Sequence, residues 1–123
     1  MATKSRKIVI WTGDSRKRLR QFPEEVRSEI GYAIFQAECG ESHLSAKRMQ
    51  GYNAVEIVSD NEGDTFRAVY TTQFEDAVYV LHCFQKKSKK GGKTPQPDLD
   101  LIKKRLRDAK RHYEASRRHG PEN

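Results

Sequence analysis

The sequence predicts a small α+β domain, in which helices pack on one face of an antiparallel β-sheet and the elements follow the order β-α-α-β-β-β-α. Three apolar runs between residues 54 and 84 follow one another through short polar turns, which indicates antiparallel pairing. Segments with helical spacing precede and follow these runs, and such helices must cover a face of the sheet. A length of 123 residues suits one domain. We therefore expect a single domain over residues 1–123, with flexible ends at 1–6 and 116–123.

The first half of the chain predicts one strand and two helices. Residues 7–12 include the run Ile-Val-Ile-Trp, which is typical of a strand. Asp14 or Ser15 can cap a short helix over residues 16–21. Pro23 suits the first turn of a second helix, whose apolar residues recur mostly every three or four positions and form one buried stripe. Gly40 is expected to end that helix.

The second half predicts three strands and a long helix. Residues 40–53 form a loop by this interpretation, because glycine, serine and asparagine interrupt any periodicity. Strands are expected over residues 54–59, 65–71 and 77–84, with Gly63 free to adopt a positive φ in the turn before the second of them. A basic loop follows over residues 86–96. The final helix is expected to begin at Pro97 or Asp98, with its apolar residues on one side.

The composition points to a polyanionic partner. Lys and Arg number 24 against 17 Asp and Glu, which gives a formal net charge of +7. This balance fits nucleic acid, an anionic membrane or an acidic protein, and an ordinary solvated basic surface fits it equally well. No segment approaches the roughly 20 apolar residues that span a bilayer, so no membrane partner is expected. Cys39 and Cys83 form no CxxC pair and the histidines lack the spacing of metal ligands, so no metal site is expected. The two cysteines are expected to be free thiols, which fits a cytoplasmic location.

Arg67 is the strongest candidate for chemistry. Side chains alternate along residues 65–71, so Phe66 and Tyr70 lie on one face of the strand and Arg67 on the other. If the helices cover the Phe66 side, Arg67 stands on an open sheet face, where a guanidinium can bind phosphate and stabilise the charge that develops on it. A cross-strand ion pair with Glu56 is equally compatible with the pattern.

The last strand supplies further candidates. Five of its side chains are expected to share one face, namely Val78, Val80, His82, Phe84 and Lys86. His82 can act as a general acid or base, although a hydrogen-bonded core histidine is the favoured interpretation. Phe84 can stack on a base or pack in the core, and the sequence favours neither.

Basic residues near these strands suggest contacts to a phosphate backbone. Lys86 and Lys87 leave the sheet edge in opposite directions, so at most one of them points toward Arg67. Besides Tyr70 and Phe84, the residues that we expect to contact RNA are Lys47, Arg48, Lys89, Lys90 and Lys93. Tyr70 is a minor candidate, because its face is assigned to the core. The cations of the final helix either extend this basic surface or form an ordinary solvated helix face.

The chemistry that these residues permit is RNA cleavage without a metal or cofactor. The sequence has no Gly-rich phosphate loop, no Ser-His-Asp arrangement and no acidic cluster for Mg²⁺. Attack of the RNA's own 2′-hydroxyl on the adjacent phosphate needs a base, an acid and cationic stabilisation, all of which side chains supply. The expected substrate is therefore RNA and not DNA, which lacks the nucleophile.

Three segments of the sequence form a recognisable set: residues 66–70 (Phe-Arg-Ala-Val-Tyr), residues 80–88, and Gly51 with residues 55–57. On these residues the sequence resembles the phage-derived, HigB-type branch of the RelE/ParE toxin superfamily over residues 7–110. The resemblance implies the same α+β fold and the toxin half of a toxin–antitoxin pair; many such toxins cleave mRNA in the ribosomal A site. Carried over by position, Arg67 is similar to the strand arginine that binds the scissile phosphate, and Lys86 or Lys87 to the basic residues after the last strand.

The resemblance has departures that affect the site. Glu56 stands where RelE itself has a catalytic lysine, and it is either a base or the partner of Arg67. The C-terminal tyrosine or histidine of several relatives has no clear counterpart here, which leaves His82 as the reserve general acid. The implied partners are a small helix-turn-helix antitoxin, mRNA and the ribosome. Two alternatives are a ParE-like inhibitor of DNA gyrase with the same fold and a non-catalytic nucleic-acid-binding phage protein.

Overall fold

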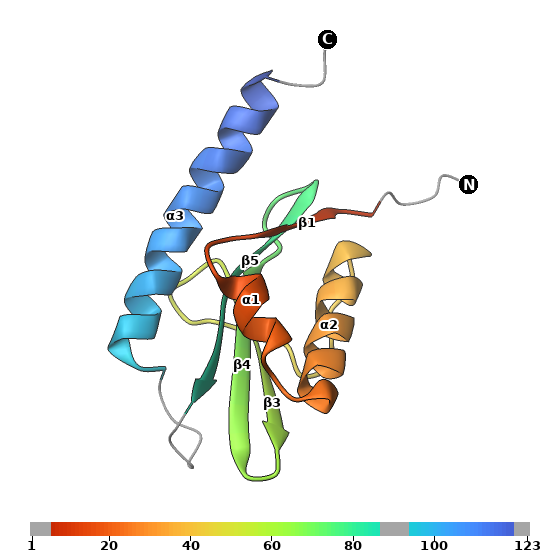
Figure 1. The fold of residues 1–123 in the computed structure, drawn as a ribbon. Helices are drawn as coiled ribbons and strands as arrows, with labels where there is room; N and C mark the ends of the chain where they lie inside the picture. The colour runs from red at the N-terminus through yellow and green to blue at the C-terminus, as the bar shows by residue number, and fades with distance from the viewer. Residues whose placement is uncertain (1–5, 87–93, 120–123) are drawn as a thin grey trace, which may run out of the picture.

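The computed structural model of the protein describes residues 6–86 and 94–119, the last two of these by backbone alone. Within these residues a sheet is flanked by helices (Figure 1). The elements in chain order are β1 (Ile8–Trp11), α1 (Ser15–Arg20), α2 (Glu24–Glu38), β2 (Lys47–Arg48), β3 (Val55–Asn61), β4 (Asp64–Thr71), β5 (Ala77–Lys86) and α3 (Gln96–His119).

The sheet has the strand order β1-β5-β4-β3-β2. The strands from β2 to β5 pair antiparallel, whereas β1 pairs parallel with β5 at the edge. The β3–β4 hairpin turns through Glu62 and Gly63, whose φ angles of 50° and 87° suit a tight two-residue turn. The predicted α+β meander is therefore confirmed. Strand β2 lies inside the loop expected over residues 40–53, and its two residues are too few to produce a pattern in the sequence.

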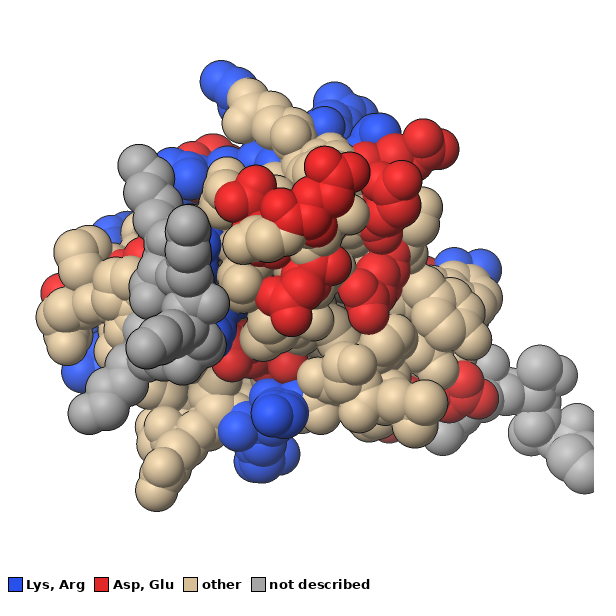
Figure 2. Space-filling model, turned by 90° about the horizontal axis from the view of Figure 1, so that it is seen from below, with Lys and Arg blue, Asp and Glu red and all other residues tan. Residues whose placement is uncertain are grey.

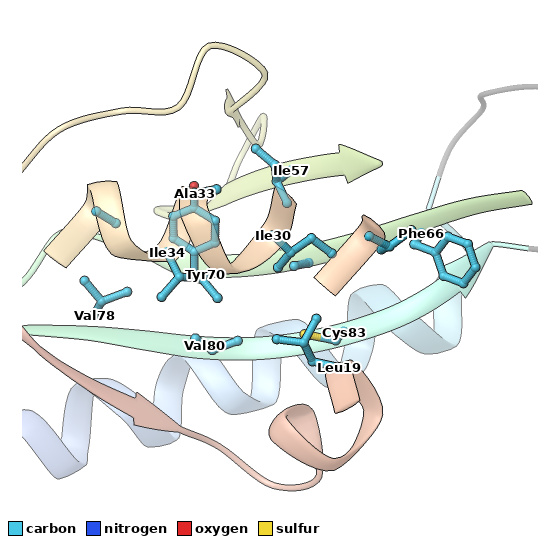
Figure 3. Close-up of a cluster of buried hydrophobic side chains, with 13 residues drawn as sticks. Leu19, Ile30, Ala33, Ile34, Ile57, Phe66, Tyr70, Val78, Val80 and Cys83 are labelled. Carbon is cyan, nitrogen blue, oxygen red and sulfur yellow. The ribbon is translucent and has the colours of Figure 1, made fainter. Parts of the chain in front are cut away.

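Helices α1 and α2 cover one face of the sheet (Figure 1). The predicted apolar stripe of α2 is buried there, with Val26, Ile30 and Ile34 among its members. These side chains pack with Ile57 of β3 and Tyr70 of β4, as Figure 3 shows for part of the cluster. This layer is the one that the sequence predicts on the Phe66 side of the sheet.

Helix α3 packs against the opposite face. Its residues Ile102 and Ala109 join a second core cluster that contains Val69, Tyr79 and Leu81 of β4 and β5. The expectation that helices pack on one face thus holds for α1 and α2, and α3 adds a second layer. The physical reason lies in β5, where residues 77–84 are all buried and therefore need a cover on each side. The helix also continues to His119, past residue 115, after which the sequence suggested fraying.

A β-bulge in β5 sets which side chains face α3. Val69 pairs with His82 but Tyr70 pairs with Val80, so Leu81 is an extra residue in β5. Val78 and Val80 therefore pack toward α1 and α2, while His82 and Phe84 lie on the α3 side. The expectation that these side chains share one face with Lys86 is wrong for the two valines, because the bulge changes the alternation between them and His82.

Polar contacts from the segment after β1 and from α3 hold the bulge. The carbonyl oxygens of Val80 and Leu81 accept hydrogen bonds from Thr12 Oγ1 at 3.0 and 3.1 Å. Arg105 Nη1 of α3 donates to the Leu81 oxygen at 2.8 Å, and its Nη2 donates to Asp14 Oδ1 at 2.9 Å. Gly13 has a φ of 52°, and a Cβ placed there would lie only 2.4 Å from Arg105 Nη2. Arg105, one of the surface cations of the sequence, is thus a structural residue.

Candidate functional site

Three charged side chains on the α3 face form the Arg67 cluster, which we define as Glu56, Arg67 and Lys86. Glu56 and Arg67 are diagonal neighbours across β3 and β4, because Glu56 pairs with Val69 and Arg67 with Val58. Arg67 Nη1 donates a hydrogen bond to Glu56 Oε2 at 2.7 Å. The two side chains are only 8% and 15% exposed. The cross-strand ion pair left open by the sequence is therefore present.

Arg67 does not stand on an open sheet face. It lies on the face opposite Phe66, as the alternation predicts, but that face carries the α3 layer, and Arg67 is buried. The first turn of α3 contacts the neighbouring strand, where Asp98 binds His82. The expectation of an open face is wrong because it assumed that every helix lies on the other side.

Lys86 is the least satisfied side chain of the cluster. It is 6% exposed, and its Nζ has no hydrogen-bond partner among the described residues. Burial lowers the pKa of the ammonium below the usual 10.5, the charge of Arg67 lowers it further, and the charge of Glu56 partly offsets both. Two cations and one carboxylate leave the cluster with an excess of positive charge. An anion bound beside Lys86 would compensate that excess.

The exposed cations of β2 extend the positive surface beside the cluster. Lys47 of β2 pairs in register with Glu56 of β3, so the two residues are direct cross-strand neighbours. Arg48 follows it and donates a hydrogen bond through Nη2 to Asn53 Oδ1 at 3.2 Å. Both side chains remain exposed to solvent. They therefore occupy positions from which a phosphate backbone is accessible.

The aromatic candidates and His82 occupy packing positions. His82 is 1% exposed, and its Nε2 donates to Asp98 Oδ1 at 2.7 Å. Its ring stacks on Phe84, and burial lowers the pKa of the imidazole despite the opposing effect of Asp98. Tyr70 is buried under α2, and burial raises the pKa of its phenol to about 12. In this arrangement none of the three side chains is accessible to RNA.

The remaining expectations from the sequence concern four further lysines, metal sites, membrane spans and the two cysteines. Lys87, Lys89, Lys90 and Lys93 lie outside the described residues. Over residues 6–86 and 94–119 no three His, Cys, Asp or Glu side chains come together as a metal site. Within the same residues, none of the helices has the length and apolar composition that a membrane span needs. Cys39 and Cys83 are free thiols, and burial raises the pKa of Cys83 to about 12.

Negative charge gathers at one end of the molecule. Figure 2 views the end at which the β3–β4 hairpin lies, and acidic side chains crowd much of that surface. The contributors include Asp60, Glu62 and Asp64 of the hairpin region and Glu24 and Glu25 at the start of α2. Lys86 pairs in register with Thr65 beside this hairpin, so the acidic side chains repel a polyanion that approaches the Arg67 cluster from this end and favour an approach from the other end of β3.

Comparisons with known proteins agree with the fold. Residues 17–107, which include the whole Arg67 cluster, match the model of a family described as phage-derived protein Gp49-like. The structure is similar to a mutant of the E. coli toxin RelE in the free state, with a TM-score of 0.52 and 13% identity over 67% of this chain and 85% of that chain. At that identity the similarity establishes the fold alone. The chain matches none of the curated proteins with which it was compared.

Proposed function

Because the chain belongs to the Gp49-like family of phage-derived proteins and has the fold of RelE, we propose that it is the toxin of a toxin–antitoxin pair and that it cleaves RNA. The observation that carries this proposal is the buried ammonium of Lys86, which lacks a hydrogen-bond partner among the described residues and lies beside Arg67. A buried cation of this kind is stabilised by an anion, and a phosphodiester has the charge and the oxygen acceptors to provide that stabilisation.

The proposed substrate contact uses both cations of the cluster. The guanidinium of Arg67 binds one phosphate oxygen while Glu56 holds its orientation. The ammonium of Lys86 binds the phosphate from β5, the strand on the other side of β4. As the reaction proceeds, charge builds up on the phosphate oxygens, and the two bound cations stabilise that charge more than they stabilise the ground state.

The proposed reaction is an internal transesterification. The 2′-oxygen of the ribose forms a bond to the adjacent phosphorus, and the bond from that phosphorus to the 5′-oxygen of the next nucleotide breaks. The proton of the 2′-hydroxyl passes to the carboxylate of Glu56, and the leaving 5′-oxygen takes a proton from Lys86. The lowered pKa of Lys86 makes it a stronger acid than an exposed lysine. The products are a 2′,3′-cyclic phosphate and a 5′-hydroxyl.

RNA binding at this cluster requires a local rearrangement, because both cations are largely buried. Lys86 is the side chain that moves at the lowest cost, since its ammonium breaks no hydrogen bond to the described residues when it turns outward. Arg67 stays tied to Glu56 during that movement. The buried arrangement is thus the RNA-free form of the proposed site.

The proposed partners follow from the toxin assignment. A toxin of this kind needs a cognate antitoxin, and we propose a small helix-turn-helix protein in that role. The mRNA on the ribosome is the proposed substrate, and Lys47 and Arg48 lie where they can contact its backbone beside the cluster.

The test compares wild type with Arg67→Ala and with Arg111→Ala, an exposed arginine of α3 that serves as the matched control. Each protein is induced in cells, and breaks in mRNA and in DNA are mapped. Loss of one cation that stabilises the transition state is expected to slow RNA cleavage by about 100- to 1,000-fold in Arg67→Ala. Arg111→Ala should cleave like wild type. Full activity of Arg67→Ala would refute the site, and DNA breaks with intact RNA would favour a gyrase inhibitor instead.

A further inference from the structure

A groove runs between α3 and the segment that precedes β3, and we call it the α3 groove. Its volume is about 470 Å³, within the range of about 300–1,000 Å³ that ligand sites usually have. One wall is α3 and the other is formed by residues 51–53 and the chain after β4. The side chains that matter for its chemistry are Lys103, Arg107, Lys110, Tyr52, Asn53 and Gln73.

The helical wall of the groove is a row of cations. Lys103, Arg107 and Lys110 are spaced by four and three residues, so they lie on one side of α3, and all three are exposed. Within residues 6–86 and 94–119 none of them forms an ion pair, whereas the adjacent Lys104 pairs with Asp108. Like charges at this spacing destabilise a helix by about 0.2–0.5 kcal/mol per pair. A bound polyanion would remove that repulsion.

The opposite wall of the groove contains the aromatic ring of Tyr52 and the side-chain amides of Asn53 and Gln73. Tyr52 packs at the margin of the second core cluster and is only partly buried, so part of its ring borders the groove. Asn53 donates through Nδ2 to Gln73 Oε1 at 2.9 Å and accepts from Arg48, which fixes the amides in place. An aromatic ring that faces a row of cations is the arrangement that binds single-stranded nucleic acid, since bases stack while phosphates meet the cations.

The α3 groove continues the face that holds the Arg67 cluster. Ala54 follows the groove residues, lies two residues before Glu56, and shares a core cluster with Val69 and Ile102. Ile102 immediately precedes Lys103 in α3. The groove lies at the end of β3 opposite the hairpin, and therefore away from the acidic end of the molecule. A strand of RNA that leaves the cluster along β3 would enter it.

We propose that the α3 groove binds the backbone of single-stranded RNA next to the bond that is cut, an inference that rests on the proposed function. Lys103, Arg107 and Lys110 contact successive phosphates, and the ring of Tyr52 stacks on a base. Charge complementarity favours RNA over a protein segment, because the described lining carries three cations and no carboxylate.

The test measures binding of a labelled 2′-O-methyl oligoribonucleotide of about 12 nucleotides, which cannot be cut, by fluorescence anisotropy over a range of salt concentrations. The groove variant is K103E/R107E/K110E. The control K17E/R20E/R27E makes the same change in net charge at exposed positions of α1 and α2. Each phosphate contact to a single strand contributes about 0.7 to the logarithmic salt slope, so the groove variant should lose about 2 units of slope and bind about tenfold more weakly or worse. The control should keep the slope of wild type.

Three outcomes would contradict the proposal that the α3 groove binds RNA. The first is that RNA binding weakens equally in the groove variant and the control, and the second is that the groove variant binds RNA like wild type. The third is that the groove variant keeps RNA binding but loses binding to a protein partner. A neutral variant, K103Q/R107Q/K110Q, and circular dichroism of each protein guard against misfolding. Cleavage of an unmodified mRNA on programmed ribosomes, measured in parallel, separates the two proposals. If the groove variant loses RNA binding but wild type does not cleave, the proposed RNA-binding groove is supported and the proposed nuclease activity is refuted. If wild type cleaves but the groove variant binds RNA normally, the nuclease is supported and the groove is refuted.

Discussion

Lys86 is a largely buried cation that pairs with no carboxylate of the part of the chain that the structure describes. Among the described residues its ammonium has no hydrogen-bond partner, and both burial and Arg67 disfavour its charged form. Burial of a charge in this way costs stability, so its presence is best explained by a function that needs it. Arg67 differs, because Glu56 compensates its charge at 2.7 Å. The two cations therefore respond differently to substitution.

The substitution Lys86→Met is expected to separate stability from activity. Methionine keeps much of the length of the side chain but removes the desolvated charge, so the melting temperature should rise. RNA cleavage should fall by at least about tenfold, because one phosphate contact and the proposed proton donor are lost. Thermal unfolding and a cleavage assay measure the two effects. The exposed Lys104→Met serves as the control, and a variant at residue 86 that melts lower yet cleaves normally would contradict this assignment.

Strand β5 is organised by its bulge. Without the extra residue Leu81, the alternation that points Val78 and Val80 toward α2 would carry His82, Phe84 and Lys86 to the same side. With it, Lys86 lies on the face of Arg67. The bulge depends on Thr12, which follows β1, and on Arg105 of α3. The local geometry of the site thus depends on residues far from it in sequence.

The substitution Arg105→Ala is expected to weaken both the fold and the site. It removes the hydrogen bond to the Leu81 carbonyl and the ion pair with Asp14, at a cost of about 2–4 kcal/mol in the free energy of unfolding. Chemical denaturation measures that loss, and hydrogen exchange should show faster opening of β5 amides. Arg111→Ala, an exposed arginine on the same helix, should change neither. Similar effects from the two substitutions would mean that Arg105 does not hold the bulge.

Burial of His82 on the face that α3 covers makes the fold sensitive to acid, and the contact with Asp98 partly opposes that effect. Burial lowers the folded-state pKa of His82 below 6.5, so the folded protein keeps the ring neutral where the unfolded chain takes up a proton. This contribution to stability is complete above pH 6.5 and is lost as pH falls toward the folded-state pKa. The loss can reach about 1.4 kcal/mol per pH unit.

Comparison of wild type with His82→Gln isolates that contribution. The free energy of unfolding is measured by urea denaturation at pH 7.5 and pH 5 for each protein. Wild type should lose more stability between the two pH values than the variant, because the other histidines are common to both. An equal loss in the two proteins would show that His82 does not carry the pH dependence.

Negative and positive side chains are concentrated at opposite ends of the molecule. Acidic side chains gather at the hairpin end, whereas the exposed cations Lys103, Arg107 and Lys110 line the α3 groove at the other end of β3. The net charge of +7 therefore understates the positive potential at the α3 groove. This distribution would orient a polyanion before it makes any close contact.

Much of the fold and part of the candidate site can be predicted from the sequence, but not all of either. The order of the elements, the stripe of α2 and the separation of Arg67 from Phe66 follow from local periodicity, which is visible in a single segment. The bulge is hidden, because Leu81 is one apolar residue among many. The α3 groove is hidden as well, since residues some 50 positions apart form it. One signal was available: the nearly unbroken apolar run of β5 indicates burial on two faces, and hence a helix on each.

The identity of the nucleophile is the most direct question to put to this protein. A short RNA on programmed ribosomes is first cut by wild type to locate the cleaved bond, and a second RNA then carries a single 2′-deoxy nucleotide on the 5′ side of that bond. We expect cleavage there to stop while other sites remain sensitive, and the products of the unmodified RNA to end in a 2′,3′-cyclic phosphate. Continued cleavage at the 2′-deoxy position would contradict attack by the ribose hydroxyl, and with it the role that we assign to Arg67 and Lys86.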